Sequence, residues 1–224
     1  MQDVFVVALT GATGSGKSTV AKHLVETYGF TRISIAQPLK EIVQRAFSLT
    51  DEQVFGDFAA KEETDPRYGV SPRWLLQRIA TEGIRTVLGE NFWIDLAVEK
   101  ILASDTGFVV IDDLRFLNEA RRIFSLSRFS VSRASNPLSG RDIHSAIFRL
   151  AGVQQGSVEY QEHPSEAEQR SPKFTALVRE TVTAPRSPNG RLLIEAFEEV
   201  LARYRPSAGR SLLSRLIPRT RNTP

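Results

Sequence analysis

A cluster of glycines, one lysine and one serine near the start of this 224-residue chain has the residue types and spacing of a phosphate-binding loop. The cluster reads Gly11-Ala12-Thr13-Gly14-Ser15-Gly16-Lys17-Ser18 and fits the pattern G-x-x-x-x-G-K-[ST]. Glycines allow backbone angles that turn consecutive N–H groups inward around phosphate oxygens. We therefore expect Lys17 to reach the outer phosphates of a nucleotide and Ser18 to hold Mg²⁺ through its hydroxyl.

The segments on either side of this loop are those that position such a loop in a protein. Residues 5–9 form a short apolar run, as expected of a buried parallel strand. Residues 19–28 carry apolar side chains at helical spacing. Because strand, glycine loop and helix follow in that order, the sequence favours a nucleotide site over a Gly/Ser-rich turn without a ligand.

Strand-like and helix-like segments alternate along the rest of the chain. We expect strands at 5–9, 30–35, 108–111, 129–132 and 178–183. We expect helices at 19–28, 38–47, 71–88, 92–103, 117–126 and from 190 onward, with a helical turn at 50–56. Among their apolar residues, Ile42 and Val87 are placed on inward faces.

This alternation predicts an α/β protein with the three-layer αβα fold of phosphate-loop NTPases and a mainly parallel central sheet. In such sheets ligands bind at the carboxyl ends of the strands. Asp112, Asp113 and Arg115 follow the predicted strand at 108–111, so we expect them to converge with the phosphate loop.

Two stretches interrupt the rhythm. Residues 57–70 are polar and contain proline and glycine, which predicts a mobile connection. Residues 134–162 form a long insertion that carries Arg141 and Arg149, with helical spacing of apolar residues at 143–151, and we interpret it as a lid. The predicted organisation is one domain over 1–204, with a helical acceptor-binding region at 36–104 and a flexible basic tail at 205–224.

Composition limits the class of protein further. The absence of cysteine excludes disulfides, cysteine nucleophiles and thiolate metal sites, and it fits a reducing cytoplasm. No apolar run approaches the roughly 20 residues that cross a bilayer, and the start does not resemble a signal peptide. We therefore expect a cytoplasmic protein without a membrane partner.

The formal net charge of +3 comes from the C-terminal tail. Residues 205–224 hold five arginines and no acid, which leaves 24 basic against 26 acidic residues elsewhere. Five arginines are few and no aromatic residue is interleaved with them, so we expect a solvated terminus and no nucleic-acid partner.

The phosphate loop alone is shared by kinases, GTPases and translocating ATPases. The chain lacks the guanine-reading pattern Asn-Lys-x-Asp and has no second basic domain, which weakens the last two classes. A single small domain with a lid and scattered arginines favours a kinase that acts on a small phosphorylated substrate.

Five further segments resemble motifs of the phage deoxynucleoside monophosphate kinases, in the same order along most of the chain. They are AQPLKE at 36–41, GVSPRWLLQ at 69–77, ATEGIR at 80–85, VIDDLRFLNEA at 110–120 and HPSE at 163–166. The resemblance implies transfer of the γ-phosphoryl group of ATP to a deoxynucleoside monophosphate, with Mg²⁺ as cofactor. It also suggests a homodimer and a phage protein that acts in the bacterial cytoplasm.

The resemblance also implies a role for each motif residue. Lys17, Asp113 and Arg115 would be catalytic, and Ser18 and Asp113 would hold Mg²⁺. ATP would contact Gly11, Ala12, Thr13, Gly14, Ser15, Gly16, Lys17, Ser18, Thr19 and Arg133. The acceptor nucleotide would contact Lys40, Arg73, Trp74, Gln77, Arg85, Arg115 and Glu119.

Several of these residues have a structural alternative. Asp112 is interpreted as a solvated strand end rather than a catalytic group, and Trp74 and Trp93 as core residues. Glu119 is equally compatible with capping its own helix. His163, Ser165 and Glu166 have the pattern of a capped helix start.

Three other functions also remain open at the level of sequence. One is another small-molecule kinase of the phosphomevalonate type, and a second is a phosphate-loop ATPase without an acceptor. The third is a regulatory nucleotide-binding module that uses the basic tail to engage nucleic acid.

Overall fold

The computed structural model describes residues 3–126, 143–152 and 164–203. The described residues fall into two compact units. We call Ser34–Glu99 the helical unit and the residues before and after it the sheet unit.

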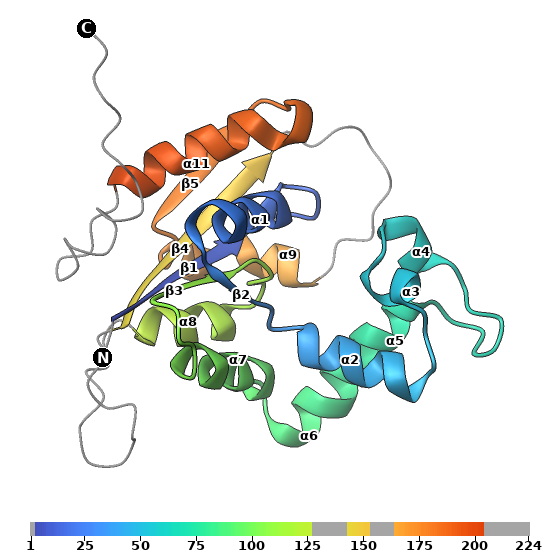
Figure 1. The fold of residues 1–224 in the computed structure, drawn as a ribbon. Coiled ribbons are helices and arrows are strands. Elements are labelled where there is room, and N and C mark those ends of the chain that lie inside the picture. The colour runs from blue at the N-terminus through green and yellow to red at the C-terminus, as the bar shows by residue number, and fades with distance from the viewer. Residues whose placement is uncertain (1–2, 127–142, 153–163, 204–224) are drawn as a thin grey trace, which may run out of the picture. The chain divides into compact units, whose positions relative to one another are not determined.

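The sheet unit is built on five strands that all run parallel. They are β1 (Val4–Thr10), β2 (Thr31–Ile33), β3 (Phe108–Ile111), β4 (Ile143–Gly152) and β5 (Glu180–Ala184), in the spatial order β2-β3-β1-β4-β5 (Figure 1). All of β1 is buried, as expected of a central strand covered on both faces. Ala8 lies opposite both Ile111 and Ile147, so β1, β3 and β4 end at one edge of the sheet.

Helices cover both faces of this sheet. They are α1 (Lys17–Tyr28), α8 (Leu117–Leu126), α9 (Pro164–Gln169), α10 (Pro172–Thr175), the 3₁₀ helix η2 (Pro188–Gly190) and α11 (Arg191–Arg203). Leu24 of α1 and Phe197 of α11 share a core with Phe5, Val7 and Leu9 of β1. Helix α8 packs on β4 from the other face (Figure 1). The predicted αβα layering is confirmed.

The helical unit contains the remaining helices. They are α2 (Gln37–Ala46), α3 (Asp51–Phe55), α4 (Phe58–Glu62), α5 (Pro72–Arg78), the π-helix η1 (Ile79–Arg85), α6 (Thr86–Leu88) and the greater part of α7 (Phe92–Leu102). Capping residues in the sequence mark the N-termini of several of these helices. The Ser71 hydroxyl accepts a hydrogen bond from the Trp74 amide and caps α5, and Thr50 and Gln53 form a capping box at α3.

The predicted lid over 134–162 is wrong for residues 143–152, which form strand β4. Apolar residues at Ile143, Ala146, Ile147 and Leu150 fit a helix face, but they also fit a strand buried on both sides. Pairing with β1 on one side and β5 on the other decides for the strand, because it satisfies the backbone of both neighbours. The rest of the predicted lid, the strand predicted at 129–132 and the tail lie outside the described residues.

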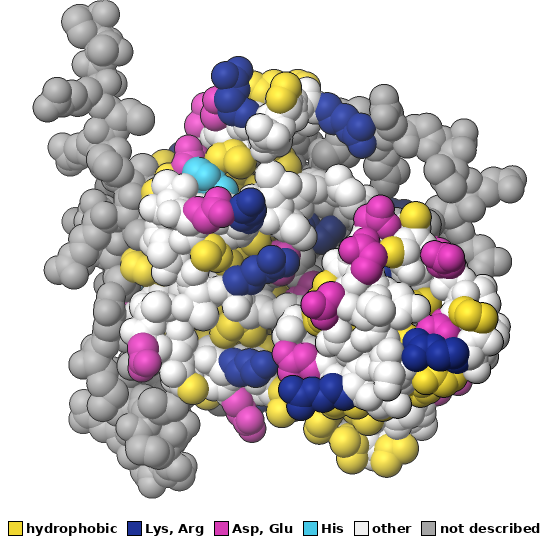
Figure 2. Space-filling view, turned by 45° about the vertical axis from the view of Figure 1, so that its right-hand side comes forward, with side chains coloured by type: hydrophobic (Ala, Val, Ile, Leu, Met, Phe, Trp, Pro, Cys, Tyr) yellow, Lys and Arg dark blue, Asp and Glu magenta, His cyan; other side chains and the backbone are white. Residues whose placement is uncertain are grey.

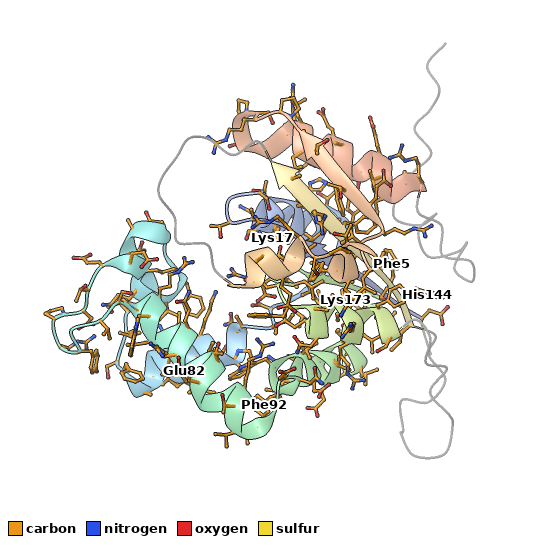
Figure 3. The ribbon with its side chains drawn as sticks, turned by 180° about the vertical axis from the view of Figure 1, so that it is seen from behind. Phe5, Lys17, Glu82, Phe92, His144 and Lys173 are labelled. Carbon is orange, nitrogen blue, oxygen red and sulfur yellow. The ribbon has the colours of Figure 1, made fainter. Side chains whose placement is uncertain are left out.

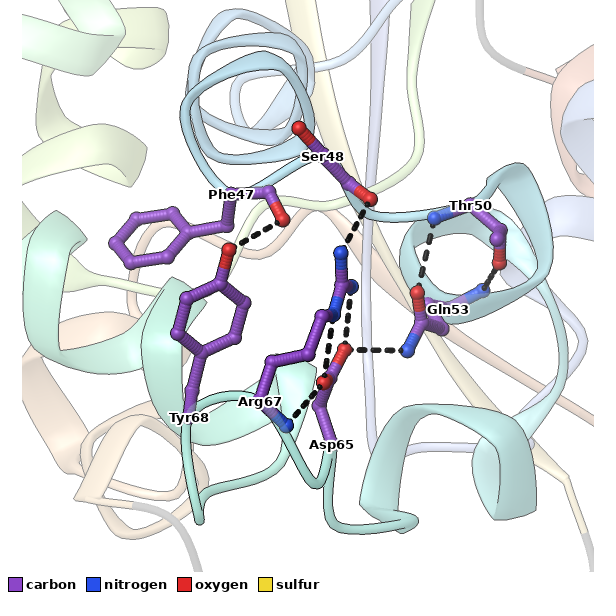
Figure 4. A network of polar contacts seen from close by, with 7 residues as sticks. All are labelled: Phe47, Ser48, Thr50, Gln53, Asp65, Arg67 and Tyr68. Carbon is purple, nitrogen blue, oxygen red and sulfur yellow. Dashed lines mark hydrogen bonds and ion pairs between the residues drawn. The ribbon is translucent and has the colours of Figure 1, made fainter.

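The prediction of a mobile connection over 57–70 is also wrong. The segment contains α4 and then a turn built around the buried carboxylate of Asp65 (Figure 4). Arg67 donates from Nε at 2.9 Å and from Nη2 at 2.6 Å to the two carboxylate oxygens, and Gln53 donates from Nε2 at 2.9 Å. The hydrogen bonds from Arg67 hold the pKa of Asp65 well below its usual range, although burial opposes the shift.

Side chains of the helical unit do not all face as predicted. Ile42 is 49% exposed and Val87 is 76% exposed, although both were expected to face inward. Helix α2 buries only the narrow stripe of Leu39 and Val43. At Val87 the cause is η1: a π-turn holds more residues than an α-turn, so residues after it rotate away from the face that a 3.6-residue period predicts.

Two general properties of the described residues bear on partners. None of their helices is both long enough and apolar enough to cross a membrane. On the face drawn in Figure 2, basic and acidic side chains are interspersed rather than gathered by sign.

Candidate nucleotide-binding site

Glycine is required at two positions of the loop between β1 and α1. Gly11 has φ of +137°, and a Cβ there would lie 2.2 Å from the carbonyl oxygen of Leu150 in β4. Gly16 has φ of +91°, and a Cβ there would lie 2.3 Å from Cδ2 of Leu193 in α11. At Gly11 the backbone of β4 and the positive φ both disfavour a side chain, and at Gly16 the positive φ does so, which explains the glycine spacing of the motif.

Lys17 is the first residue of α1, and its side chain folds back over the loop. Its Nζ donates hydrogen bonds of 2.8 Å to the Gly11 carbonyl and 2.7 Å to the Ala12 carbonyl. In Figure 3 it lies at the opposite end of the sheet from Phe5 and His144. Among the described residues, no side chain caps this end of α1. The loop therefore combines a cation with a helix N-terminus, which is an arrangement that binds phosphate.

The far end of α1 is fixed to α11 through Glu198. The Glu198 carboxylate lies 2.8 Å from Nε2 of His23 and accepts a hydrogen bond from the Tyr28 hydroxyl. Burial, together with this hydrogen bond, raises the pKa of Tyr28 to about 12, so the phenol stays protonated as the donor. These contacts anchor the helix that carries the phosphate loop.

Asp112 and Asp113 follow β3 but have different surroundings. Asp112 is 4% exposed, and Arg32 on β2 donates to its two oxygens at 3.1 Å and 2.6 Å. The interpretation of Asp112 as a solvated strand end is therefore wrong, because β2 places Arg32 directly beside it. Asp113 is half-buried. The next charged residue, Arg115, is exposed and makes no ion pair with any described residue.

Glu119 caps the start of α8. Its side chain is buried, and Oε2 accepts hydrogen bonds of 2.9 Å from the backbone N–H groups of Arg115 and Phe116. Of the two roles that the sequence allows, the structure shows capping. Its predicted contact with the acceptor stays a prediction.

Sequence reasoning missed the end of α9. Gln169 is buried, and its Oε1 accepts hydrogen bonds from the Thr10 hydroxyl at 3.0 Å and from the Gly11 N–H at 3.1 Å. Oε1 of the neighbouring Glu168 accepts from the Leu117 N–H at 2.7 Å. Both contacts join segments far apart in the chain, so no local pattern signals them. Only their position just after the HPSE segment could have drawn attention to them.

The predicted acceptor contacts other than Arg115 and Glu119 lie in the helical unit. Nε of Arg73 lies 3.2 Å from a carboxylate oxygen of Glu62, and Nε of Arg85 donates to the Glu90 carbonyl at 3.3 Å. Nζ of Lys40 lies 5.4 Å from the centre of the Phe55 ring, and Gln77 is exposed.

The two tryptophans differ in burial. Trp93 is 5% exposed, so its assignment to the core is confirmed. Trp74 is 44% exposed with the Arg78 guanidinium over its ring, so the same assignment is wrong for Trp74. Ser165 is buried and lies on α9, as the predicted helix start requires. Arg133, Arg141 and His163 lie outside the described residues.

The parallel sheet, the glycine loop and Lys17 together define a phosphate-loop nucleotide-binding protein. No protein-family model matches the sequence. The chain is 30% identical over 163 residues to a protein of Acanthamoeba polyphaga mimivirus assigned as a deoxynucleotide monophosphate kinase, covering 66% of this chain and 83% of that protein. It is 24% identical over 221 residues to the deoxynucleoside-5'-monophosphate kinase of Escherichia phage T5, covering 72% and 84%. The chain belongs to the deoxynucleoside monophosphate kinase family.

Solved structures give a more distant similarity. Shikimate kinase from Acinetobacter baumannii is 12% identical with a TM-score of 0.44, covering 89% of this chain and 94% of that chain. TT1252 from Thermus thermophilus is 15% identical with a TM-score of 0.43, covering 91% and 100%.

Proposed function

We propose that this chain transfers the γ-phosphoryl group of ATP to a deoxynucleoside monophosphate, giving ADP and a deoxynucleoside diphosphate. One structural observation carries the proposal beyond family membership. The phosphate loop and the segment from Asp113 to Arg115 follow adjacent parallel strands at one edge of the sheet. Donor-phosphate and acceptor-phosphate groups need such neighbouring sites for in-line transfer.

The reaction asks for charge neutralisation rather than for a strong base. The acceptor phosphate is largely dianionic near pH 7, because its second pKa is about 6. The main barrier is then the repulsion between two anionic phosphates, which fixed cations reduce. Lys17 supplies one cation at the ATP phosphates. Arg115, exposed and without an ion pair among the described residues, supplies a second toward the transferring or acceptor phosphate.

Ser18 and Asp113 would hold Mg²⁺, which would neutralise phosphate charge when bound. Ser18 is exposed at the first turn of α1, and Asp113 is half-buried after β3. Among the described residues, no group of three or more His, Asp or Glu side chains could hold a metal ion. This donor set fits Mg²⁺, since that ion commonly binds through one or two protein ligands with nucleotide phosphates and water.

The helical unit would bind the acceptor nucleotide. Arg73 and Gln77 stand four residues apart on one face of α5, suited to a phosphate and a base edge. Trp74 on the same helix is exposed and would stack on the base, next to the Arg78 guanidinium that lies over its ring. Lys40 and Arg85 complete this proposed set.

The experiment is a coupled assay of ADP release with Mg·ATP against dAMP, dGMP, dCMP, dTMP, the ribonucleotides and phosphomevalonate. Stimulation by one or more deoxynucleotides supports the proposal and reads out the base preference. Stimulation by phosphomevalonate alone would assign a different kinase. ADP release that does not change with any acceptor would indicate an ATPase. Lys17→Met removes the cation of the phosphate loop and is the control that shows the ADP release depends on this site.

A further inference from the structure

Gln169 holds the first turn of the phosphate loop from the face of the sheet opposite α1. Its Oε1 accepts from both Thr10 and Gly11, the last residue of β1 and the first of the loop. A backbone N–H can only donate, so the atom that faces Gly11 has to be the amide oxygen. Both donors are satisfied by one buried acceptor, at a position where water has little access.

This contact continues toward Lys17. Gly11 donates its N–H to Gln169, and its carbonyl accepts a hydrogen bond of 2.8 Å from Nζ of Lys17. Gly11 has a left-handed φ and lies against the backbone of β4. Its peptide orientation is therefore set on one side by β4 and on the other by Gln169. A change at Gln169 should alter the loop backbone that the nucleotide phosphates meet.

The same end of α9 holds the second loop of the site. Glu168, next to Gln169, accepts from the Leu117 N–H at the start of α8, directly after Arg115 and Phe116. The end of α9 is itself tied to β4, because Arg149 donates from Nη2 to the Gln169 carbonyl at 2.7 Å and to Thr175 Oγ1 at 3.2 Å. Two adjacent residues thus touch the loops after both β1 and β3.

We propose that Gln169 is a positioning residue of the phosphate loop, and that α9 uses Glu168 and Gln169 to hold the two phosphate-handling loops at a fixed separation. Gln169 does not touch the nucleotide in this proposal and acts through Thr10 and Gly11. The proposal rests on the proposed function only in taking the loop as the ATP site, and its test includes ATP binding without acceptor.

The test compares Gln169→Leu with Gln169→Glu. Leucine has a similar size but no acceptor, so the Thr10 hydroxyl and the Gly11 N–H lose their partner. We expect Gln169→Leu to weaken ATP binding by about 10–100-fold, by analogy with the loss at metal sites when the residues that orient the metal ligands are removed. The Kd and KM of the acceptor should stay within about twofold. Glutamate keeps two acceptor bonds, so Gln169→Glu should recover most of the ATP affinity.

A matched control separates positioning from stability. Ser171 caps α10 two residues after Gln169 through a 3.2 Å hydrogen bond from the Phe174 N–H, and its other hydrogen bonds are with the backbone of Glu168 and Thr175 rather than with either loop. Ser171→Ala should lower the melting temperature and leave the Kd for ATP unchanged. Calorimetric titration with ATP alone, thermal melting and KM values for both substrates are measured on the full chain.

Two milder variants keep the proposal testable if Gln169→Leu does not fold. Thr10→Val removes one of the two donors with little change of shape, and Thr10→Ser keeps it. We expect Thr10→Val to weaken ATP binding several-fold and Thr10→Ser to restore it. The proposal is overturned if Gln169→Leu folds and binds ATP within twofold of wild type. It is equally overturned if Gln169→Leu lowers ATP and acceptor affinities together, or if Ser171→Ala weakens ATP binding as much as Gln169→Leu does, because either result would indicate a general stability effect.

Discussion

Arg32 on β2 and the buried carboxylate of Asp112, directly after β3, form a two-point ion pair, with Arg32 Nη2 2.6 Å from Asp112 Oδ2. Asp112 therefore belongs to the fold, where it joins an edge strand to its neighbour. Its sequence neighbour Asp113 is half-buried and Arg115 is exposed, and the roles of both in phosphoryl transfer stay predictions. Of these two adjacent aspartates, Asp112 is paired by Arg32, a residue 80 positions away in the sequence.

Arg32→Ala should destabilise the protein. The carboxylate of Asp112 is almost fully buried and would lose both donors. We expect a loss on the order of 2 kcal/mol in the free energy of unfolding, below the full cost of a buried unpaired charge because the Arg32 side chain is about half exposed. Urea unfolding measures it. An unchanged unfolding midpoint would show that water replaces Arg32 without cost.

Arg115→Ala should lower activity without lowering stability, in contrast to Arg32→Ala. The side chain is exposed and makes no ion pair among the described residues, so stability should stay within about 0.5 kcal/mol. The kcat with the best acceptor should fall about 100-fold or more if Arg115 neutralises phosphate in the transition state. Arg115→Lys should recover part of the rate. Turnover of Arg115→Ala within about threefold of wild type would remove Arg115 from the mechanism.

Lys17→Met should abolish most phosphoryl transfer while leaving the fold intact. The hydrogen bonds of Nζ that the structure shows on the loop are to the Gly11 and Ala12 carbonyls and to Ser15 Oγ, all within the loop itself. Loss of one charged donor to the transferring group should lower kcat by about 10²–10³-fold. The check is single-turnover transfer at saturating ATP together with the melting temperature. Unaltered kcat with a raised KM for ATP would restrict Lys17 to binding.

Variants of Glu119 separate capping from acceptor binding. Glu119→Ala removes the acceptor of two N–H groups at the start of α8 and should cost about 1–2 kcal/mol of unfolding free energy. Glu119→Gln keeps an oxygen there and should restore most of it. Urea unfolding and the KM of the acceptor are measured for both. A raised acceptor KM in Glu119→Gln at unchanged stability would favour direct contact instead.

The Asp65 network predicts a pH-dependent stability of the helical unit. Its hydrogen bonds from Arg67 depress the pKa of Asp65, so this stabilisation is fully present above the unfolded pKa of about 4. It is lost as the pH falls further, toward the depressed folded pKa. Asp65→Asn should therefore lower the unfolding midpoint at pH 7, and its difference from wild type should narrow below about pH 4.

Urea unfolding from pH 3 to 7 measures this difference. Asp57→Asn, which keeps an acceptor for the Ala60 N–H, is the control and should show little change at any of these pH values. A difference between Asp65→Asn and wild type that does not vary with pH would argue against the charge of Asp65 as the cause.

Part of this protein could be predicted from the chain alone because the signals are local. The glycines at 11, 14 and 16 indicate that the backbone adopts positive φ angles at these positions. The short apolar runs of β1 and β3 indicate buried strands. Helix α8 is predicted well because a regular apolar face lies within its own residues. For the helix predicted over 71–88 only the start is correct, where Ser71 caps α5, because the segment continues as the π-helix η1 and then α6.

Tertiary structure decided what local signals leave open. Residues 143–152 fit a helix or a strand by spacing, and only the backbone groups of β1 and β5 on either side select the strand. The burial of Asp112 depends on Arg32, and the support of Gly11 depends on Gln169, 158 positions away. A local sequence pattern determines backbone dihedral angles and which face of a helix or strand is apolar. The hydrogen-bond partner of a buried polar group depends instead on how distant segments pack together.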